Sequence, residues 1–190
     1  MNESLKKQHI IKHPSDNLMV VIMGEAGSGK DTFANYITQE FSKENYVTHR
    51  ITFANKLKDE AYLLGWDGKK DEKGRALLQD LGKVMKNYHG QDYYAKQAFV
   101  NDRRIKDHPN LWIITDARFL SEINHCRKKA EEYGAELKIV KIDRSQDKTW
   151  HSDLTDEQKK DISEQEWRQT KPDIVVMNDG KDPTFGNFKF

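Results

Sequence analysis

Residues 24–30 (GEAGSGK) contain glycines and a lysine at the spacing of a phosphate-binding loop. Gly24 and Gly29 are separated by four residues, and Lys30 follows at once. Glycines let backbone amides approach phosphate oxygens, and a lysine ammonium offsets the charge that develops when a phosphoryl group is transferred. The spacing therefore predicts a nucleoside triphosphate site in which Lys30 is a catalytic residue.

The far end of this loop departs from the usual pattern. A Ser or Thr hydroxyl usually follows the lysine directly, but here Asp31 intervenes and the hydroxyl belongs to Thr32. We expect Thr32 to lie beside the Mg²⁺ that accompanies ATP. Asp31 keeps two interpretations, because it suits either a metal-bound water or the first turn of a helix, where acidic residues are favoured. The predicted ATP-binding residues are Gly24, Ala26, Gly27, Ser28, Gly29, Lys30, Asp31 and Thr32.

A second acidic residue, Asp116, directly follows the apolar segment 111–115 (LWIIT). A carboxylate at the end of a buried strand beside the loop is placed to act as a second metal-side group for Mg²⁺. Asp116 equally suits the N-cap of the next helix, so both interpretations stay open. Arg118 lies two residues further on and is the second predicted catalytic residue, for contact with the transferring phosphate. An ordinary surface arginine is the alternative.

These residues need a scaffold in which strands and helices alternate. The run 18–23 (LMVVIM) is short, contains two adjacent valines and precedes glycine, as in a strand buried on both faces of a parallel sheet. Helical spacing of apolar residues predicts an amphipathic helix over 30–42. The alternation predicts an α/β fold with a five-stranded parallel sheet and helices on both faces. The other strands are expected at 47–53, 111–115, 137–142 and 173–177.

The chain is expected to form a single domain over residues 18–190, because its length suits one hydrophobic core. Residues 1–17 are interpreted as a flexible leader. Residues 55–108 are mainly helical, with helices expected at about 55–64, 75–88 and 91–104. They are too many for a simple crossover, which predicts a helical substrate-binding insertion. Residues 144–171 carry many charges and few aliphatic residues, which indicates an exposed helical hairpin or lid, with a solvated connector as the alternative.

Composition indicates which binding partners and which cellular compartment are expected. Lys and Arg total 32 against 31 Asp and Glu, so there is no global positive field and stable nucleic-acid binding is not expected. No apolar run approaches the roughly 20 residues that cross a bilayer, and the start lacks the apolar stretch of a secretory signal. The single cysteine, Cys126, fits a reducing compartment. We therefore expect a cytoplasmic protein without membrane contact.

Seven segments, taken together, resemble the bacteriophage-type deoxynucleoside monophosphate kinases, which belong to the P-loop kinase superfamily. The segments keep the order of that family and cover most of the chain from residue 18 onward. The first and the fifth are the most specific, and the combination carries the resemblance. The segments are GEAGSGKDT (24–32), TFANKLK (52–58), RALLQDLG (75–82), DYYAKQAF (92–99), ITDARFLSEI (114–123), DISEQEW (161–167) and DIVVMNDG (173–180).

The resemblance implies a P-loop kinase fold and transfer of the γ-phosphoryl group of ATP to a deoxynucleoside monophosphate. By matched position it implies that Lys58 and Arg75 bind the acceptor's phosphate and that Phe53 packs near its sugar or base. A solvated helix face remains open for Lys58 and Arg75, and core packing for Phe53. Arg144, after the strand 137–142, is the third predicted catalytic residue. The resemblance also implies that the protein forms a homodimer. If a phage encodes the chain, the protein would be located in the cytoplasm of the host.

Two features depart from the family pattern. Asp161 and Ile162 stand before Ser163 and Glu164, where relatives tend to carry histidine, and the chain ends at Phe190, where a longer closing helix is expected. A P-loop kinase for another phosphorylated metabolite, such as phosphomevalonate or dephospho-coenzyme A, is the first alternative, because the GSGKD core suits it too. A non-kinase module that binds a nucleoside triphosphate as a switch is the second.

Overall fold

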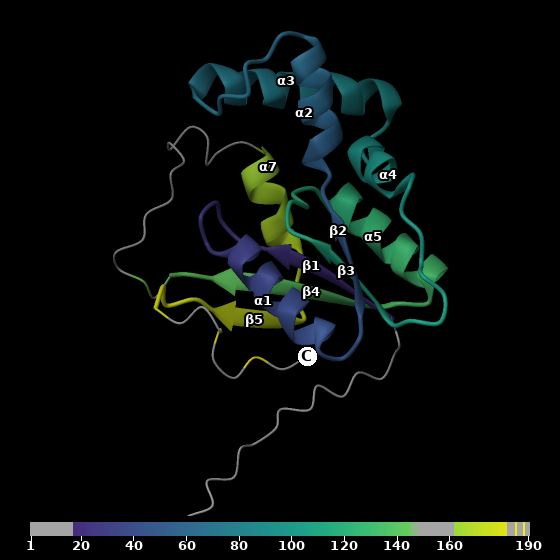
Figure 1. Ribbon diagram of the computed structural model, residues 1–190. Helices are drawn as coiled ribbons and strands as arrows, with labels where there is room; N and C mark the ends of the chain where they lie inside the picture. The colour runs from purple at the N-terminus through teal and green to yellow at the C-terminus, as the bar shows by residue number, and fades with distance from the viewer. Residues whose placement is uncertain (1–16, 146, 148–161, 182–184, 186–187, 189–190) are drawn as a thin grey trace, which may run out of the picture.

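The computed structural model describes residues 17–145, 147, 162–181, 185 and 188 (Figure 1). Five strands form one sheet in the order β2-β3-β1-β4-β5, and each pair of neighbours is parallel. The predicted five-stranded parallel sheet is therefore confirmed. The strands are β1 (Asn17–Met23), β2 (Val47–Ile51), β3 (Asn110–Ile114), β4 (Glu136–Asp143) and β5 (Ile174–Met177).

The central strand β1 pairs with β3 on one side and β4 on the other. Val20 is in register with Ile113 of β3 and Lys138 of β4. The chain leaves β1 toward β2 and later returns past β1 to reach β4, so the direction of winding reverses beside β1. In open α/β sheets, ligands bind outside the carboxyl ends of the strands at such a reversal. The loop after Met23 lies at that position.

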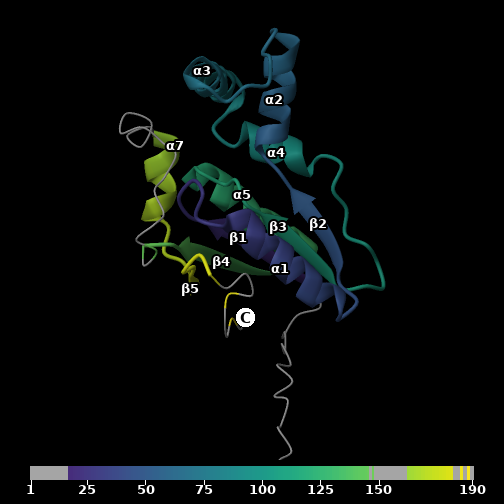
Figure 2. The same ribbon diagram turned by 60° about the vertical axis from the view of Figure 1, so that its left-hand side comes forward.

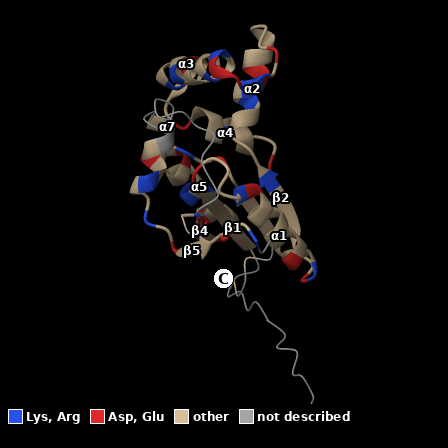
Figure 3. Cartoon of the chain, turned by 90° about the vertical axis from the view of Figure 1, so that its left-hand side faces the viewer, with Lys and Arg blue, Asp and Glu red and all other residues tan. Residues whose placement is uncertain are grey.

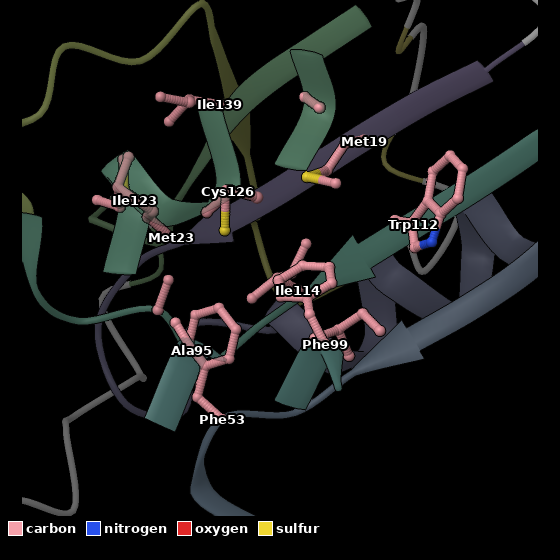
Figure 4. Close-up of a cluster of buried hydrophobic side chains, with 14 of the residues drawn as sticks. Met19, Met23, Phe53, Ala95, Phe99, Trp112, Ile114, Ile123, Cys126 and Ile139 are labelled. Carbon is pink, nitrogen blue, oxygen red and sulfur yellow. The ribbon is translucent and has the colours of Figure 1, made fainter. Parts of the chain in front are cut away.

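Alternate residues of β1 face opposite sides of the sheet and belong to two hydrophobic cores. Leu18, Val20 and Ile22 pack in the core beneath α1 (Lys30–Ser42). Met19 and Met23 pack in the other core, beneath α5 (Leu120–Tyr133), where Cys126 is buried (Figures 2 and 4). Every residue of β1 is buried, as expected for a strand covered by helices on both faces.

The chain between β2 and β3 forms three helices that stand beyond the end of the sheet (Figure 1). They are α2 (Ala54–Leu63), α3 (Glu72–His89) and α4 (Tyr93–Phe99). The expected helices at 55–64 and 75–88 are confirmed, although α3 begins earlier because the Asp71 side chain accepts a hydrogen bond from Gly74 N at 2.9 Å. The helix expected at 91–104 is shorter. Burial of α3 is confined to Gly74, Gly82 and Lys86.

Two expected regions lie partly outside the described residues. Residues 1–16 of the expected leader are not described, and Asn17, which had been assigned to that leader, is the first residue of β1. The expected lid over 144–171 includes residues 146 and 148–161, which are outside the described part, and α7 (Ile162–Gln165), followed by the 3₁₀-helix η1 (Glu166–Gln169). None of the described helices is long and apolar enough to cross a membrane.

Candidate phosphoryl-transfer site

The predicted phosphate loop joins β1 to α1 at the carboxyl edge of the sheet. Its three glycines have positive φ angles of 151° at Gly24, 75° at Gly27 and 100° at Gly29. At Gly24, a Cβ atom would lie 2.7 Å from the Ile142 carbonyl oxygen and from Ser28 Oγ. The backbone conformation therefore favours glycine at all three positions, and at Gly24 the close approach of β4 also requires it.

The loop is also held by Asn178, which follows the edge strand β5 and was not predicted from the sequence. Its Nδ2 donates to the Ser28 carbonyl at 2.7 Å, and its own backbone N donates to the Asp143 carbonyl at 2.8 Å. A Cβ atom at Gly29 would overlap this amide. Asn178 directly follows β5, so its place at the end of a strand was the available signal.

Lys30, at the first position of α1, turns its side chain back along the loop. Its ammonium donates to the carbonyl oxygens of Gly24 at 2.9 Å and Glu25 at 2.7 Å. Burial and the nearby charge of Arg118 lower the pKa of Lys30 to about 8, although Asp31 and other carboxylates oppose this shift. The ammonium thus lies against the backbone of the loop, and its contact with a phosphate stays a prediction.

The loop has polar atoms suited to a phosphate chain. Ser28 Oγ is buried, and within the described residues it has no hydrogen-bond partner. A buried hydroxyl without a partner costs free energy unless a ligand or water satisfies it. Gly29 N-caps α1 without a side-chain cap, so the amides of the first turn remain available to an anion. The other expected contacts between Gly24 and Thr32, Ala26 included, stay predictions.

Two acidic residues meet at the carboxyl ends of β1 and β3. Asp31 Oδ1 accepts a hydrogen bond from Thr115 Oγ1 at 2.9 Å. Asp116 accepts from Phe53 N at 3.2 Å and from Ala54 N at 2.9 Å, and burial raises its pKa. Asp116 therefore binds the first backbone N–H groups of α2, which comes from a distant part of the sequence. The alternative that it caps the next helix is not supported, because Phe119 is the N-cap of α5.

These groups are compatible with a magnesium ion bound mainly by phosphate and water. Among the described residues there is no group of three or more His, Cys, Asp or Glu side chains that could hold a metal ion by itself. Magnesium in phosphoryl-transfer sites is usually held by one or two protein groups, the substrate phosphates and water. Thr32, in the exposed first turn of α1, together with Asp31 and Asp116, offers a donor set of that kind.

Four basic side chains form a second cationic region, which we call the acceptor cluster: Lys58, Lys70, Arg75 and Arg118. Burial lowers the pKa of Lys70, and the charges of the other three lower it further. Arg75 Nε donates to the Lys70 carbonyl at 3.0 Å, so the first turn of α3 is tied to the preceding loop. Figure 3 shows basic and acidic segments interspersed along α2 and α3. The structure therefore brings together the predicted Lys58, Arg75 and Arg118.

Lys70 was missed because it lies in the loop 65–71 between α2 and α3. Trp66 organises this loop, since its Nε1 donates to the Lys69 carbonyl at 2.9 Å and its ring lies 4.9 Å from that of Tyr62. A Cβ atom at Gly74 would collide with the same carbonyl. The sequence GWDGKKDEKG showed a polar loop, but which lysine faces the site depends on this packing.

Phe53 packs in the core and offers almost no surface to a substrate. Its side chain is 2% exposed, and its ring centroid lies 6.3 Å from that of Phe99 (Figure 4). The alternative left open by the sequence, core packing at the end of β2, is the one that the structure supports. Its backbone N–H still donates to Asp116, so Phe53 helps to position that carboxylate.

Two arginines from the region after β4 contact the phosphate loop. Arg144 Nη1 donates to the Gly27 carbonyl at 3.1 Å, and Nη2 contacts Asp147 at 2.9 Å. Arg168, in η1, donates to Glu25 Oε1 at 2.9 Å and was not predicted. Both cations therefore lie at the loop, and the catalytic role of Arg144 stays a prediction.

Comparisons with known proteins give a fold likeness and no family. No family model matches the chain, and no curated protein matches it. Among solved structures, the Mycobacterium tuberculosis APS kinase CysC in complex with AMPPNP and APS is 15% identical, with a TM-score of 0.45 over 90% of this chain and 93% of that one. APE1195 is 16% identical, with a TM-score of 0.42 over 87% of each chain. At these values the likeness carries no argument about substrate, so function is argued from the site.

Proposed function

We propose that the chain transfers the γ-phosphoryl group of ATP to a deoxynucleoside monophosphate, giving ADP and a deoxynucleoside diphosphate. The carrying observation is the acceptor cluster beside the phosphate loop. A protein that only binds or hydrolyses a nucleoside triphosphate needs one phosphate site. A second group of cations suits an acceptor that already carries a phosphate. This group lies close to the loop, since the charge of Arg118 lowers the pKa of Lys30 and the charges of Arg118 and Lys58 oppose the rise in the pKa of Asp116.

The reaction needs no general base. The second pKa of a phosphate monoester is about 6, so an acceptor phosphate oxygen is largely ionised near neutral pH and attacks directly. Its approach to ATP must overcome repulsion between two anions. In this proposal Lys58, Lys70 and Arg75 hold the acceptor phosphate, while Lys30, Arg118 and Arg144 offset the charge of the transferring phosphoryl group.

Magnesium would lie beside Thr32, with Asp31 and Asp116 holding its bound water. The ion supplies charge neutralisation across the β and γ phosphates when it is bound. Asp116 is already oriented by the backbone N–H groups of Phe53 and Ala54. Its carboxylate therefore has a fixed direction before substrates arrive, which reduces reorganisation during transfer.

The nucleotide identity of the acceptor rests on the sequence resemblance. A kinase for phosphomevalonate, dephospho-coenzyme A or a similar metabolite would use the same two cationic regions. A non-kinase nucleotide-binding module would have no need of the acceptor cluster. An ATP-dependent reaction of this kind fits the expected cytoplasmic location.

The discriminating experiment measures ADP release with ATP, Mg²⁺ and a panel of deoxynucleoside, ribonucleoside and isoprenoid monophosphates. We expect deoxynucleoside monophosphates to accelerate ADP release. Acceleration by an isoprenoid monophosphate alone would favour the metabolite kinase, and ADP release that no acceptor changes would refute phosphotransfer to these classes.

The acceptor cluster has a matched pair of test variants. Lys70→Gln should raise the KM for the acceptor about tenfold, the scale of one charge-assisted hydrogen bond, and leave the KM for ATP unchanged. Lys69→Gln is the control, because Lys69 is the adjacent residue and its exposed side chain pairs with Asp67 at 3.3 Å instead. Equal effects of the two substitutions would remove Lys70 from the acceptor site.

We also propose that two copies pair through the outer face of α3. Leu77, Leu81, Val84 and Tyr88 follow one another at intervals of four, three and four residues, the spacing of a helix-pairing seam. Val84 is 62% and Tyr88 83% exposed. Asp80 and Lys83 lie 4.0 Å apart beside this stripe, so an antiparallel pair would bring opposite charges together. Sedimentation equilibrium should give a dimer that Val84→Glu dissociates, and a monomeric parent protein would contradict the proposal.

A further inference from the structure

Helix α3 turns a mixed face toward the rest of the protein, in which Met85 packs against the core and charged side chains lie beside it. Arg75 and Lys86 are eleven residues apart, which is three helical turns and about 16 Å along the axis, so they project from the same side. Gly82 lies between them on that side and is buried against Leu57. One end of this face thus reaches the acceptor cluster, and the other end reaches α5.

Lys86 forms a buried ion pair at the α5 end. Its Nζ lies 3.2 Å from Glu122 Oε1, and the two side chains are only 9% and 5% exposed. The same ammonium lies 3.0 Å from the centroid of the Phe119 ring. Lys86 is therefore fixed by a carboxylate and an aromatic ring that both belong to the start of α5.

The second oxygen of Glu122 holds the turn that carries Arg118. Oε2 accepts a hydrogen bond from Arg118 N at 2.9 Å and one from Phe119 N at 3.2 Å. Glu122 is the third residue of α5, where a carboxylate can reach back to the amides that precede the helix. One carboxylate thus joins Lys86 of α3 to the backbone of Arg118.

A buried ion pair is an inefficient way to stabilise a fold, because the loss of hydration offsets most of the attraction between the charges. Well-packed apolar side chains would join α3 to α5 equally well. An ion pair and directional hydrogen bonds also fix the orientation of the groups they join, which apolar packing does less precisely. The pair fixes the orientation of the turn between Asp116 and α5, and Arg118 is the residue on that turn.

We infer that Lys86 and Glu122 are positioning residues for phosphoryl transfer, which set Arg118 and the α3 side of the acceptor cluster in a common register. The inference rests on the proposed function and deepens it. Arg118 contacts the reacting groups, whereas Lys86 and Glu122 act only through it. An error of about 1 Å in such a placement lowers the rate by up to about a hundredfold.

The test compares Lys86→Met with Lys129→Met. Lys129 is on α5 and has the same two kinds of contact, an ion pair with Glu132 at 2.8 Å and the ring of Tyr133 at 5.5 Å, but it is remote from the transfer site. We expect Lys86→Met to lower kcat at least tenfold, roughly the effect of a modest misplacement, with the KM for ATP unchanged. Lys129→Met should resemble the parent protein. Equal kcat values for the two variants would overturn the inference.

The pH profile separates positioning from loss of packing. Burial raises the pKa of Glu122, and the charge of Lys86 opposes that shift. Without Lys86 the pKa of Glu122 should rise further, so the charged carboxylate, which binds the two backbone N–H groups more strongly, should form only at higher pH. The ratio of kcat for Lys86→Met to kcat for Lys129→Met should therefore increase with pH. A constant low ratio would indicate lost packing and would overturn the inference.

Hydrogen exchange gives a readout that does not depend on the reaction. In Lys86→Met the amides of Arg118 and Phe119 should exchange about tenfold faster at neutral pH, while Lys129→Met leaves them unchanged. Glu122→Gln, which keeps the side-chain shape, gives the same measurement if Lys86→Met does not fold. Unchanged exchange would overturn the link even if the enzyme is active. Faster exchange in a protein without nucleotide kinase activity would refute the proposed function and keep the link.

Discussion

Replacement of Lys30 by methionine should stabilise the fold while it removes phosphoryl transfer. The side chain stays long and apolar, but the buried charge disappears. The pKa of Lys30 falls from 10.5 to about 8 because burial and Arg118 disfavour the ammonium. A lowered pKa in the folded protein means that folding is opposed by this charge at neutral pH. The charged form of Lys30 would therefore be unfavourable in the free protein and favourable only when a phosphate is bound.

The magnitude follows from that pKa difference. At 1.36 kcal/mol per pKa unit, the decrease from 10.5 to about 8 sets an upper limit of about 3 kcal/mol on the penalty. The ammonium also donates to the carbonyls of Gly24 and Glu25, and water must replace those bonds in the variant. We therefore expect a net gain of about 1–2 kcal/mol, since lost hydrogen bonds to a charged group cost a similar amount. For a chain of this size the gain raises Tm by roughly 2–8 °C.

The assay is urea denaturation of the parent protein and Lys30→Met between pH 6.5 and 10.5. Unfolded chains hold the Lys30 proton up to a pH near 10.5, whereas the folded protein releases it near 8. Stability of the parent protein should therefore rise between these pH values relative to the variant, so the advantage of Lys30→Met shrinks. Lys43→Met, at the exposed end of α1, is the control and should show no such convergence through pH 8. A variant that is less stable at pH 6.5, or an advantage that persists to pH 10.5, would refute this account of Lys30.

Three further outcomes are expected. ATP binding should take up protons near pH 8, because bound phosphates favour the charged form of Lys30. The binding enthalpy measured by calorimetry should then depend on the ionisation enthalpy of the buffer, and no such dependence would contradict the prediction. Asn178→Ala should weaken ATP binding about tenfold, since the hydrogen bond to the Ser28 carbonyl is lost, and unchanged affinity would contradict that role. The hydrogen bond with Asp102 raises the pKa of His49, so this pair stabilises the fold below the ordinary pKa of histidine. The stabilisation is lost as the pH rises through the raised pKa of His49, and denaturation of His49→Gln should show no such loss.

The parts of the site that follow from local sequence were predictable. The LMVVIM run and the glycines that follow it specify a buried strand, a tight loop and a helix start within one continuous segment. Asp116 was recognised from its position after an apolar run. Its contact with α2 was not predicted, because residues 53–54 and 116 are brought together only by the pairing of β2 with β3.

The direction of α3 illustrates what periodicity does not decide. An apolar stripe usually turns toward the core. Here Leu77, Val84 and Tyr88 are exposed. The side of the helix that faces the protein carries Arg75 and Lys86 as well as Met85, which packs against the core. A helix that lines a charged site thus buries charged residues and leaves some apolar ones exposed, and that site is assembled from segments far apart in the chain. The Lys86–Glu122 pair could not be read from the sequence for the same reason.

Label transfer tests the central claim most directly. The protein is incubated with Mg²⁺, ATP labelled in the γ-phosphate and a mixture of deoxynucleoside monophosphates, and the products are separated. The account predicts label in deoxynucleoside diphosphates, with a rate roughly a hundredfold or more lower for Lys30→Ala, the scale of losing a preorganised charge contact. Label found only in inorganic phosphate, or equal transfer by Lys30→Ala, would contradict it.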